Sequence, residues 1–405
     1  MIRPVQFQKY GFLLFYLLLA LAVVLRIYTF RPRTLPINTL LKFEATISSE
    51  VESRPMSQKI KVLNLRIYAP NYPKYKLGDR LIIEGKVDGE GNVFSPEITK
   101  IGERASIKAN LNDFRDTILS RVSALLPSRE AALVVGALIG VDRIPEDFKV
   151  QLIKTGTIHV VVVSGQNLMI VAGVFISLSK YLGRRLSLFF SCLAVLCYAF
   201  FTGFEPPVVR ALIMVFTTTV ALYLGRTSGA LFSIFLSGSV ILLIWPDALT
   251  TPSFLLTFAA TLGIVTLGQM LSGFFSKVPV VGENAAVSLS AFIFTAPVIL
   301  YFFGSISLLA PLVNILVLEA VFPIMLFGFL LFVTSVIFTP VAQIFAFLTY
   351  LPAHYFSAVV DFFSKFDVGY IKGFAGNLYL TIFLYVLVFG LMLIWRGERD
   401  VSRAK

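Results

Sequence analysis

Long apolar runs recur between positions 11 and 395 of this 405-residue chain, and they limit its fold more than any other feature. A helix needs about 20 apolar residues to cross the hydrocarbon core of a bilayer. Only 14% of the residues are charged, whereas soluble domains average about 25%. Because only helices and closed barrels satisfy their backbone groups in lipid, the sequence predicts an α-helical polytopic membrane protein of about ten spans.

The first predicted span lies in residues 1–35, where an apolar run ends at Arg26 and Arg31. Since no small-residue cleavage site follows the run, we interpret it as an uncleaved helix rather than a signal peptide. A later stretch contains Pro311 and Pro323 and is long for one helix, so we expect a broken helix or a half-helix plus a span there. The further candidates are 159–179, 186–203, 207–225, 229–246, 252–271, 285–303, 308–337, 340–362 and 376–395.

Positive charges between the predicted spans indicate an orientation, because cytoplasmic loops collect Lys and Arg. With ten spans and a cytoplasmic N-terminus, the basic loops and the basic tail at 397–405 fall inside, although Lys365 and Lys372 break the pattern. Both termini are therefore expected in the cytoplasm. Much of the net charge of +12 follows from this topology, so the net charge is only weak evidence for a polyanionic substrate. The basic loop residues are Lys180, Arg184, Arg185, Arg226 and Lys277.

Residues 36–109 have a different pattern, in which charges are frequent and apolar residues alternate with polar ones. The alternation has period two in 41–47 and 59–67, and Gly78-Asp79 introduces another such segment. Short strands with frequent turns predict a small all-β domain outside the cytoplasm, inserted after the first helix, with an OB-like fold as the candidate. Such barrels often bind oligonucleotides, but a β-domain without a ligand fits equally well, because no aromatic stacking set is evident.

Residues 110–158 are expected to form amphipathic, interfacial helices ahead of the polytopic domain at 159–396. The apolar piece 131–141 is too short to span a bilayer. Charged residues and Pro145 follow it at once. We therefore expect an interfacial or re-entrant segment there, leading into the polar cluster described next.

A polar cluster lies in the segment 155–168 (TGTIHVVVVSGQNL), at the mouth of an apolar run. Polar side chains at membrane depth are costly and usually face a bundle interior or a water-filled path. One interpretation is therefore a polar path; the other is a helix N-terminus whose polar residues cap it and meet headgroups. The candidates for the path are His159, Ser164, Gly165, Gln166 and Asn167.

Two further constellations contain charges. Arg210 lies one turn into the span that follows Glu205 and two prolines. It snorkels to headgroups or pairs with Glu205, or it supplies a fixed positive charge for phosphates at a channel entrance. Asn314 and Glu319 lie in an otherwise apolar stretch, where an ionisable group suggests a functional site by default. The alternative for Glu319 is an interhelical hydrogen bond.

Enzyme chemistry is poorly supported. The sequence lacks metal-hydrolase motifs, a Walker A loop and a glycine-rich dinucleotide turn. We expect no catalytic residues, no metal site and no cofactor. One enzymatic alternative is an intramembrane pair of Ser164 and His354. Cys192 and Cys197 lie in one apolar helix and are interpreted as packing residues.

Four motifs occur in order along the chain, at 155–165 (TGTIHVVVVSG), 205–214 (EPPVVRALIM), 252–260 (PSFLLTFAA) and 311–314 (PLVN). Together they resemble the family of ComEC-type competence proteins, whose membrane channel carries transforming DNA across the cytoplasmic membrane. The Gly78-Asp79 segment is also similar to the extracellular OB-like domain of that family. The resemblance implies a bacterial multi-pass protein of the cytoplasmic (inner) membrane.

Two departures from the family pattern limit what the resemblance implies. Asn167 stands where the family often has a second histidine, which puts a histidine-pair mechanism in doubt. Longer members carry a C-terminal metallo-β-lactamase-like domain, whereas this chain ends about ten residues after its last predicted span. The resemblance therefore predicts that a nuclease, if one is needed, is a separate polypeptide.

The leading hypothesis is a channel that imports single-stranded DNA during natural competence. Besides the lipid bilayer, the expected partners are an external DNA-receptor protein, a nuclease, a cytoplasmic ATPase or helicase, and possible further copies of the chain. A secondary transporter or lipid-handling protein with Asn314 and Glu319 at its binding site is the alternative. A non-conducting assembly factor is the third hypothesis. Candidate phosphate contacts of the β-domain are Lys59, Lys61, Lys74 and Lys76.

Overall fold

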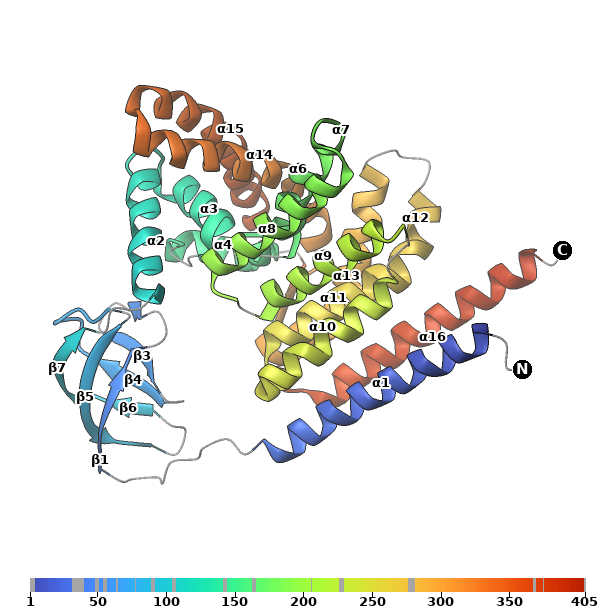
Figure 1. Ribbon diagram of the computed structural model, residues 1–405, viewed down its shortest axis with the longest axis horizontal. Coiled ribbons are helices and arrows are strands. Elements are labelled where there is room, and N and C mark those ends of the chain that lie inside the picture. The colour runs from blue at the N-terminus through green and yellow to red at the C-terminus, as the bar shows by residue number, and fades with distance from the viewer. Residues whose placement is uncertain are drawn as a thin grey trace. The chain divides into compact units, whose positions relative to one another are not determined.

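The computed structural model divides into two compact units, one of residues Phe30–Ser120 and one of Met1–Thr29 together with Arg121–Lys405. Figure 1 shows the strands β1 to β7 and most of the helix Ile107–Ser123 in the first unit, and mainly helices in the second. The structure describes residues 4–30, 40–47, 51–53, 57–62, 65–76, 78–88, 92–103, 107–140, 144–161, 165–204, 206–225, 229–275, 281–366, 369–373 and 375–403.

The β unit consists of two sheets. One has the strand order β1-β5-β7 and the other β2-β3-β4-β6. Alternate side chains of a strand point to opposite faces, and the burial of β5 alternates accordingly. The inward side chains form one core that includes Ile60, Ile67, Leu81 and Ile83, all fully buried. The strands are β1 (Leu40–Thr46), β2 (Glu52–Ser53), β3 (Gln58–Val62), β4 (Leu65–Ala69), β5 (Asp79–Lys86), β6 (Asn92–Phe94) and β7 (Glu97–Glu103).

The alternating segment 59–67 is a hairpin rather than one strand. β3 and β4 pair antiparallel, with Val62 opposite Leu65. Buried residues fall at even positions in β3 and at odd positions in β4, so the two segments do not continue one alternating strand. The Gly78-Asp79 pair starts β5 as expected. Asp79 is buried and accepts a hydrogen bond from the Lys76 amide at 2.8 Å, and its carboxylate lies 2.8 Å from the Lys100 ammonium.

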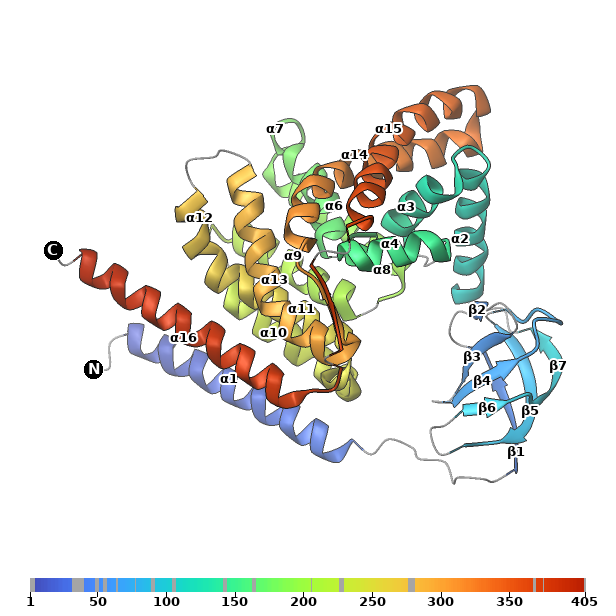
Figure 2. The same ribbon diagram turned by 180° about the vertical axis from the view of Figure 1, so that it is seen from behind.

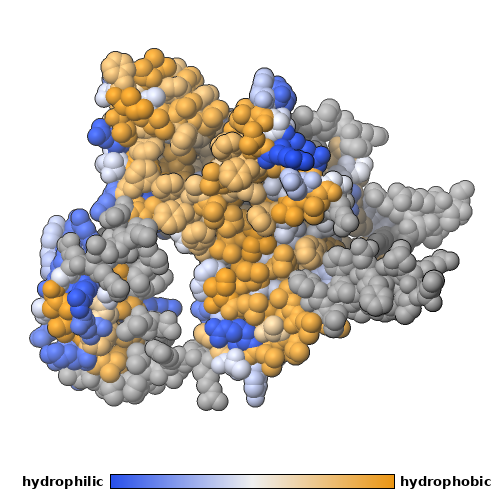
Figure 3. All heavy atoms as spheres, in the orientation of Figure 1, coloured by the Kyte–Doolittle hydropathy of each residue, from blue (hydrophilic) through white to orange (hydrophobic). Residues whose placement is uncertain are grey.

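The helical unit contains six described helices that are long and apolar enough to cross a membrane. Three shorter apolar helices accompany them, at Tyr16–Thr29, Pro207–Tyr223 and Ala230–Ile244. Apolar side chains also dominate the visible face of this unit (Figure 3). The chain is therefore a mostly helical membrane protein, and the number of ten spans stays a prediction. The six are Arg184–Thr202, Pro252–Phe275, Asn284–Phe303, Ala310–Ile337, Thr339–Ser364 and Leu378–Trp395.

Most helices follow the predicted apolar segments, but the predicted span 159–179 does not. That stretch holds the short helices Ile158–Val161 and Gly165–Ser177, and neither is long enough to cross a membrane. Cys192 and Cys197 are free and lie in α8, as predicted. The helices are α1 (Pro4–Thr29), α2 (Ile107–Ser123), α3 (Ser128–Ile139), α4 (Glu146–Thr155), α5 (Ile158–Val161), α6 (Gly165–Ser177), α7 (Ser179–Leu182), α8 (Arg184–Thr202), α9 (Pro206–Tyr223), α10 (Ala230–Ile244), α11 (Pro252–Gly263), α12 (Gln269–Phe275), α13 (Val281–Phe303), α14 (Ala310–Ile337), α15 (Thr339–Ser364) and α16 (Leu378–Arg403). A 3-10 turn, η1 (Pro246–Thr250), precedes α11, and a π-helical turn, η2 (Ile264–Gly268), joins α11 to α12.

The expected break in the stretch 308–337 is wrong. Residues Ala310–Ile337 form one continuous helix, α14. Pro311 lies in the first turn, where its missing N–H has no helical partner to lose. Pro323 lies inside the helix, and transmembrane helices tolerate such a proline when neighbouring groups satisfy the freed carbonyl.

Two contacts bear on the predicted orientation. β8 (Ser305–Ser307) pairs with β9 (Tyr370–Lys372), so the loops after α13 and α15 lie on one face of the unit (Figure 2), as the predicted topology requires. Arg121 of α2, however, lies 3.5 Å from the carbonyl of Ser335, near the end of α14 that this topology assigns to the cytoplasm. An external α2 and a fully crossing α14 are not compatible with that contact. The orientation of the termini therefore stays a prediction.

Candidate functional site

The segment 155–168 folds as the end of α4, the short helix α5 and the start of α6. Gly156 ends α4 in the left-handed conformation, with φ 72°. Thr155 and Thr157 are buried on either side of it, and their hydroxyl oxygens lie 2.9 Å apart. A β-carbon at Gly156 would come within 2.5 Å of the β-carbon of Ala310. The first turn of α14 therefore lies directly against this turn.

The Gly156 position is expected to reject any side chain. Gly156→Ala adds left-handed strain and overlap with α14, which together cost about 2 to 4 kcal/mol. The thermal stability of the purified protein in detergent, followed by size-exclusion chromatography after heating, is expected to fall clearly. Gly173→Ala is the matched control, because a β-carbon there meets no atom within 4 Å and the residue is helical. Equal stability of the two variants would contradict the expected strain.

Arg210 and Gly165 are the two predicted residues that the fold brings into contact. Arg210 projects from α9, and a β-carbon at Gly165 would lie 2.8 Å from its Nη2 atom. Nη1 of Arg210 donates to the Thr257 carbonyl of α11 at 2.7 Å and also to the Thr261 hydroxyl. The absence of a side chain at Gly165 thus lets the guanidinium reach the first turn of α6.

The charge of Arg210 has no acidic partner within the described part of the chain, where its Nε is buried without a hydrogen bond. Burying a charge among apolar helices is costly, so such residues usually mark a functional path. A guanidinium offers five N–H donors in a planar fork that suits phosphate. The N-terminus of a helix, here α6, also favours negative charge. The arrangement can therefore bind an anion between α6, α9 and α11.

Asn167, by contrast, faces protein. It is fully buried, and its amide nitrogen donates to the Ala137 carbonyl of α3 at 3.2 Å. The Tyr198 hydroxyl of α8 donates to the same carbonyl at 2.7 Å. His159 and Gln166 are exposed on α5 and α6. Ser164 and Glu205 lie outside the described residues, so the Ser164–His354 pair and the Glu205–Arg210 pair are not tested.

Asn314 and Glu319 lie on α14 and have different surroundings. The Glu319 carboxylate accepts a hydrogen bond from the Asn284 amide of α13, which is the interhelical bond considered as the alternative. Asn314 is buried, and its side-chain oxygen has no hydrogen-bond partner within the described residues.

A polar cluster that the sequence interpretation missed joins α3 to α15, and it consists of buried Glu130 and Ser357 with exposed His354. Glu130 accepts a hydrogen bond from the Ser357 hydroxyl at 3.0 Å and lies 3.1 Å from Nδ1 of His354. The Glu130 side chain is only 8% exposed. An ionisable residue at the start of a wholly apolar helix, and a histidine within another, were the available signals.

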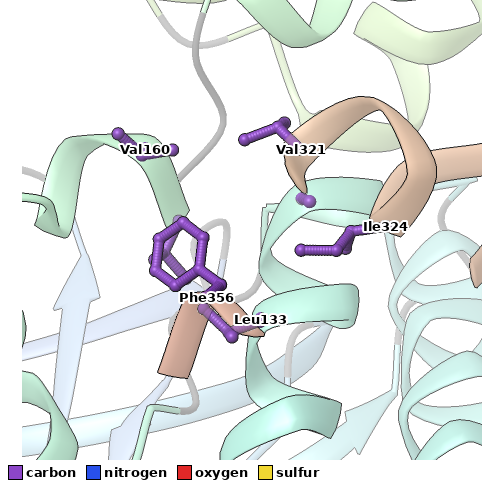
Figure 4. Close-up of a pocket in the computed structure, with 7 residues that line it drawn as sticks. Leu133, Val160, Val321, Ile324 and Phe356 are labelled. Atoms are coloured by element: carbon purple, nitrogen blue, oxygen red, sulfur yellow. The ribbon is translucent and has the colours of Figure 1, made fainter. Parts of the chain in front are cut away.

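An apolar cavity of about 10 Å³ lies beside α3 (Figure 4). It is large enough for about one water molecule, but apolar cavities stay dry. A cavity of this size is far too small to hold a nucleotide. The lining residues are Leu133, Ala137, Val160, Val161, Val321, Ile324 and Phe356.

The β unit carries aromatic and basic side chains on one sheet face. Lys59, Tyr68 and Phe94 stand in register across β3, β4 and β6. The Tyr68 and Phe94 rings stack with centroids 5.0 Å apart and an angle of 10° between their planes. Exposed Arg66 shares this face, because it is two positions from Tyr68. We call these four residues the aromatic-basic face.

The remaining basic candidates are placed less specifically. Lys74 and Lys76 are exposed in the loop before β5. Lys61 is in β3 opposite Arg66. Within the described residues, no group of three or more His, Cys, Asp or Glu side chains is placed to hold a metal ion.

Together these features define a multi-pass helical membrane protein with a half-buried arginine in its helical unit, whose Nε is buried without a hydrogen bond within the described residues. Residues 138–398 match the family model described as Competence protein. The chain belongs to this competence protein family.

Two relatives are similar to the chain. An uncharacterized protein of Aquifex aeolicus (strain VF5) is 30% identical over 65% of this chain and 61% of its own length. ComE operon protein 3 of Bacillus subtilis (strain 168) is 26% identical over 54% of this chain and 28% of its own length. The match thus spans less than two thirds of either relative. No solved structure matches the chain.

Proposed function

We propose that this protein forms a channel that imports single-stranded DNA across the bacterial cytoplasmic membrane during natural competence. Membership of the competence protein family supports a role in DNA uptake. The observation that carries the channel proposal is Arg210, a cation between α6, α9 and α11 without a described acidic partner. A passing phosphate would supply the missing counter-charge.

The aromatic-basic face supports the same substrate. Proteins that bind single strands without sequence preference combine cations along the backbone with aromatic rings on which bases stack. The Tyr68–Phe94 stack, flanked by Lys59 and Arg66, has both components. We propose that the β unit, an OB-like domain outside the cytoplasm, guides the strand toward the helical unit.

The finer features of the proposal follow the predicted topology. Both termini would lie in the cytoplasm, whereas ten full spans together with an external α2 are not compatible with the Arg121–Ser335 contact. His159, Gln166 and Gly165 would line the entrance, with Ser164 and Glu205 beside them. Asn167, dry in this conformation, would reach the path only after a rearrangement. A DNA receptor, a nuclease and a cytoplasmic ATPase or helicase would act with the channel.

One observation favours the transporter alternative, namely the Asn314 side-chain oxygen, which is buried without a hydrogen-bond partner within the described residues. The other binding residue of that alternative, Glu319, is engaged with Asn284. The assembly-factor alternative rests on the dry packing of Asn167. The Arg210 site between three helices is better explained by an anionic substrate than by packing, because an apolar side chain would fill that space without the cost of burying a charge.

Loss of the protein is expected to abolish DNA entry. In a competent strain that lacks the gene, labelled double-stranded DNA should still bind the cell surface but should not become resistant to added DNase. The intact gene should restore the protected fraction. Normal DNase-resistant uptake in the deletion strain would exclude the channel role, whereas loss of surface binding alone would indicate a receptor.

A further inference from the structure

A patch of basic and aromatic side chains lies where α7 meets α8 and where α9 ends. Lys180 and Tyr181 belong to α7, Arg184 and Arg185 begin α8, and Tyr223 is the last residue of α9. All five side chains are exposed. In Figure 3, hydrophilic residues gather around α7, next to apolar ones. We call these five residues the basic rim.

Contacts with neutral groups hold the cations of the basic rim in place. Arg184 donates a hydrogen bond to the Leu222 carbonyl, near the C-terminus of α9, where helix carbonyls favour positive charge. The Arg185 guanidinium lies 6.0 Å from the centre of the Tyr223 ring, and the Lys180 ammonium lies 4.8 Å from that of Tyr181. Cation–π contacts of this kind orient a cation over a neutral ring. The cations therefore keep their charge and most of their N–H donors for another partner.

The chain places no acidic side chain near these cations in the sequence. Between positions 155 and 246 the one acidic residue is Glu205. It comes between α8 and α9, whereas the basic rim lies at the opposite ends of these two helices. Within the described residues, none of Lys180, Arg184 and Arg185 forms an ion pair with an acidic side chain. The basic rim therefore presents three positive charges to an anion from outside the chain.

Exposed apolar side chains continue from the basic rim along the same two helices. On α8 they follow Arg185 at intervals of three or four residues, and on α9 they precede Tyr223 in the same way, so each set lies on one face of its helix. Both sets begin at the contact between Arg185 and Tyr223. We call them the apolar stripe, which consists of Phe189, Leu193, Leu196 and Phe200 of α8, 42% to 61% exposed, and Phe216 and Val220 of α9, 57% and 40% exposed.

The basic rim and the apolar stripe together match the two parts of an anionic phospholipid. A lipid phosphate accepts hydrogen bonds from guanidinium and ammonium groups, and tyrosines are enriched at the depth of the headgroups. The acyl chains would cover the stripe, since α8 is long and apolar enough to cross a membrane. A free phosphate or a nucleic acid would contact only the rim. The lipid is therefore the anion that uses both surfaces.

We propose that the basic rim and the apolar stripe form a binding site for an anionic phospholipid such as phosphatidylglycerol. Its phosphate lies at Arg184, Arg185 and Lys180, and an acyl chain lies along Phe189 and Leu193. The site does not depend on the proposed channel function or on which side of the membrane the rim faces.

Quenching of tryptophan fluorescence by brominated lipids measures which lipid occupies the site. Phe189→Trp is the reporter, because Phe189 lies one turn from Arg185 and is 61% exposed. Leu193→Trp, one turn further along the stripe, is a second reporter. Each is placed in the full chain with Trp245→Phe and Trp395→Phe, so that no other tryptophan contributes.

The protein is reconstituted into vesicles of phosphatidylcholine with a minority of phosphatidylglycerol, and each lipid in turn carries the bromine. Phosphatidylglycerol should be enriched at the reporter at least about fivefold over the bulk, since each basic residue at a membrane surface contributes about that factor. Lys180→Gln with Arg185→Gln should lower the enrichment by about fivefold or more. Arg184 is kept, because it also holds α8 to α9. Arg185→Lys, which keeps the charge, should preserve the enrichment.

Two controls separate a site from general attraction to a basic protein. Lys372→Gln should leave the enrichment unchanged, although the Lys372 ammonium is also exposed and lies 4.9 Å from the centre of a tyrosine ring, that of Tyr370. Val386→Trp places the reporter on α16 at a position that is 67% exposed and distant in sequence from the rim. It should show no enrichment, and equal enrichment at positions 189 and 386 would overturn the site.

The remaining outcomes decide between the lipid and other anions. Unchanged enrichment after Lys180→Gln with Arg185→Gln, in protein that elutes normally, would contradict the assignment of the headgroup to the basic rim. Loss of the enrichment on adding inorganic phosphate at constant ionic strength would assign the rim to free phosphate. Loss on adding a short oligothymidine would assign it to nucleic acid, and either result would overturn the lipid site. Enrichment that survives both additions supports it.

Discussion

Arg210→Ala is expected to reduce entry of DNA into the cell about 30- to 150-fold. A hydrogen bond to a charged group contributes about 1.5 to 3 kcal/mol. The upper part of that range, about 2 to 3 kcal/mol, corresponds to about a 30- to 150-fold change in rate. The same guanidinium also holds α9 to α11 through Thr257 and Thr261. Arg210→Lys, which keeps the charge but loses the planar fork, should recover part of the rate. DNase-protected uptake of labelled DNA by complemented cells measures both.

Arg26→Ala is the matched control for this prediction. Arg26 also donates to a backbone carbonyl of another helix, that of Leu243 at 3.2 Å, but it is exposed and far from the candidate site in sequence. Uptake by this variant should stay near the wild-type level. Wild-type uptake by Arg210→Ala, at an equal amount of protein in the membrane, would show that the arginine only joins helices.

The second large effect is expected on the aromatic-basic face. Tyr68→Ala combined with Phe94→Ala should weaken binding of a short labelled oligothymidine about 30-fold or more, since each stacked base contributes about 1 to 3 kcal/mol. Phe94 is 61% exposed, so its removal leaves the core of the β unit intact. Fluorescence anisotropy with the full chain in nanodiscs measures the affinity.

Controls separate stacking from charge on this face. Tyr72→Ala removes an aromatic ring that is 78% exposed but lies outside the sheet, and it should bind like the parent. Arg66→Ala should instead reduce the slope of log affinity against log salt concentration by about 1, the change expected when one phosphate contact is lost. Equal affinity of the double aromatic variant and the parent would exclude a stacking platform on this sheet.

The sequence determined the features that depend on local composition. Hydropathy placed most of the apolar helices close to their observed bounds, because the transfer free energies of the residues add up along a segment. The predicted span 159–179 is the exception, since it holds two short helices. The alternation of apolar and polar residues likewise predicted the strands near the N-terminus. The prolines of α14 led to the wrong prediction of a broken helix. Whether Pro323 interrupts a helix depends on the surrounding groups and not on the segment itself.

The tertiary structure alone decided which polar residues meet. Arg210 reaches Gly165 and Thr261, Tyr198 reaches Ala137, and Glu130 reaches His354 across 224 positions. None of these pairs has a spacing that a helix or strand period would indicate. The sequence proposed Asn167 as a path residue, and only the fold placed it, fully buried, in a hydrogen bond to the Ala137 carbonyl of α3. Polar groups in lipid take whichever partners the packing of distant helices supplies, so local pattern names the residues and only the fold pairs them.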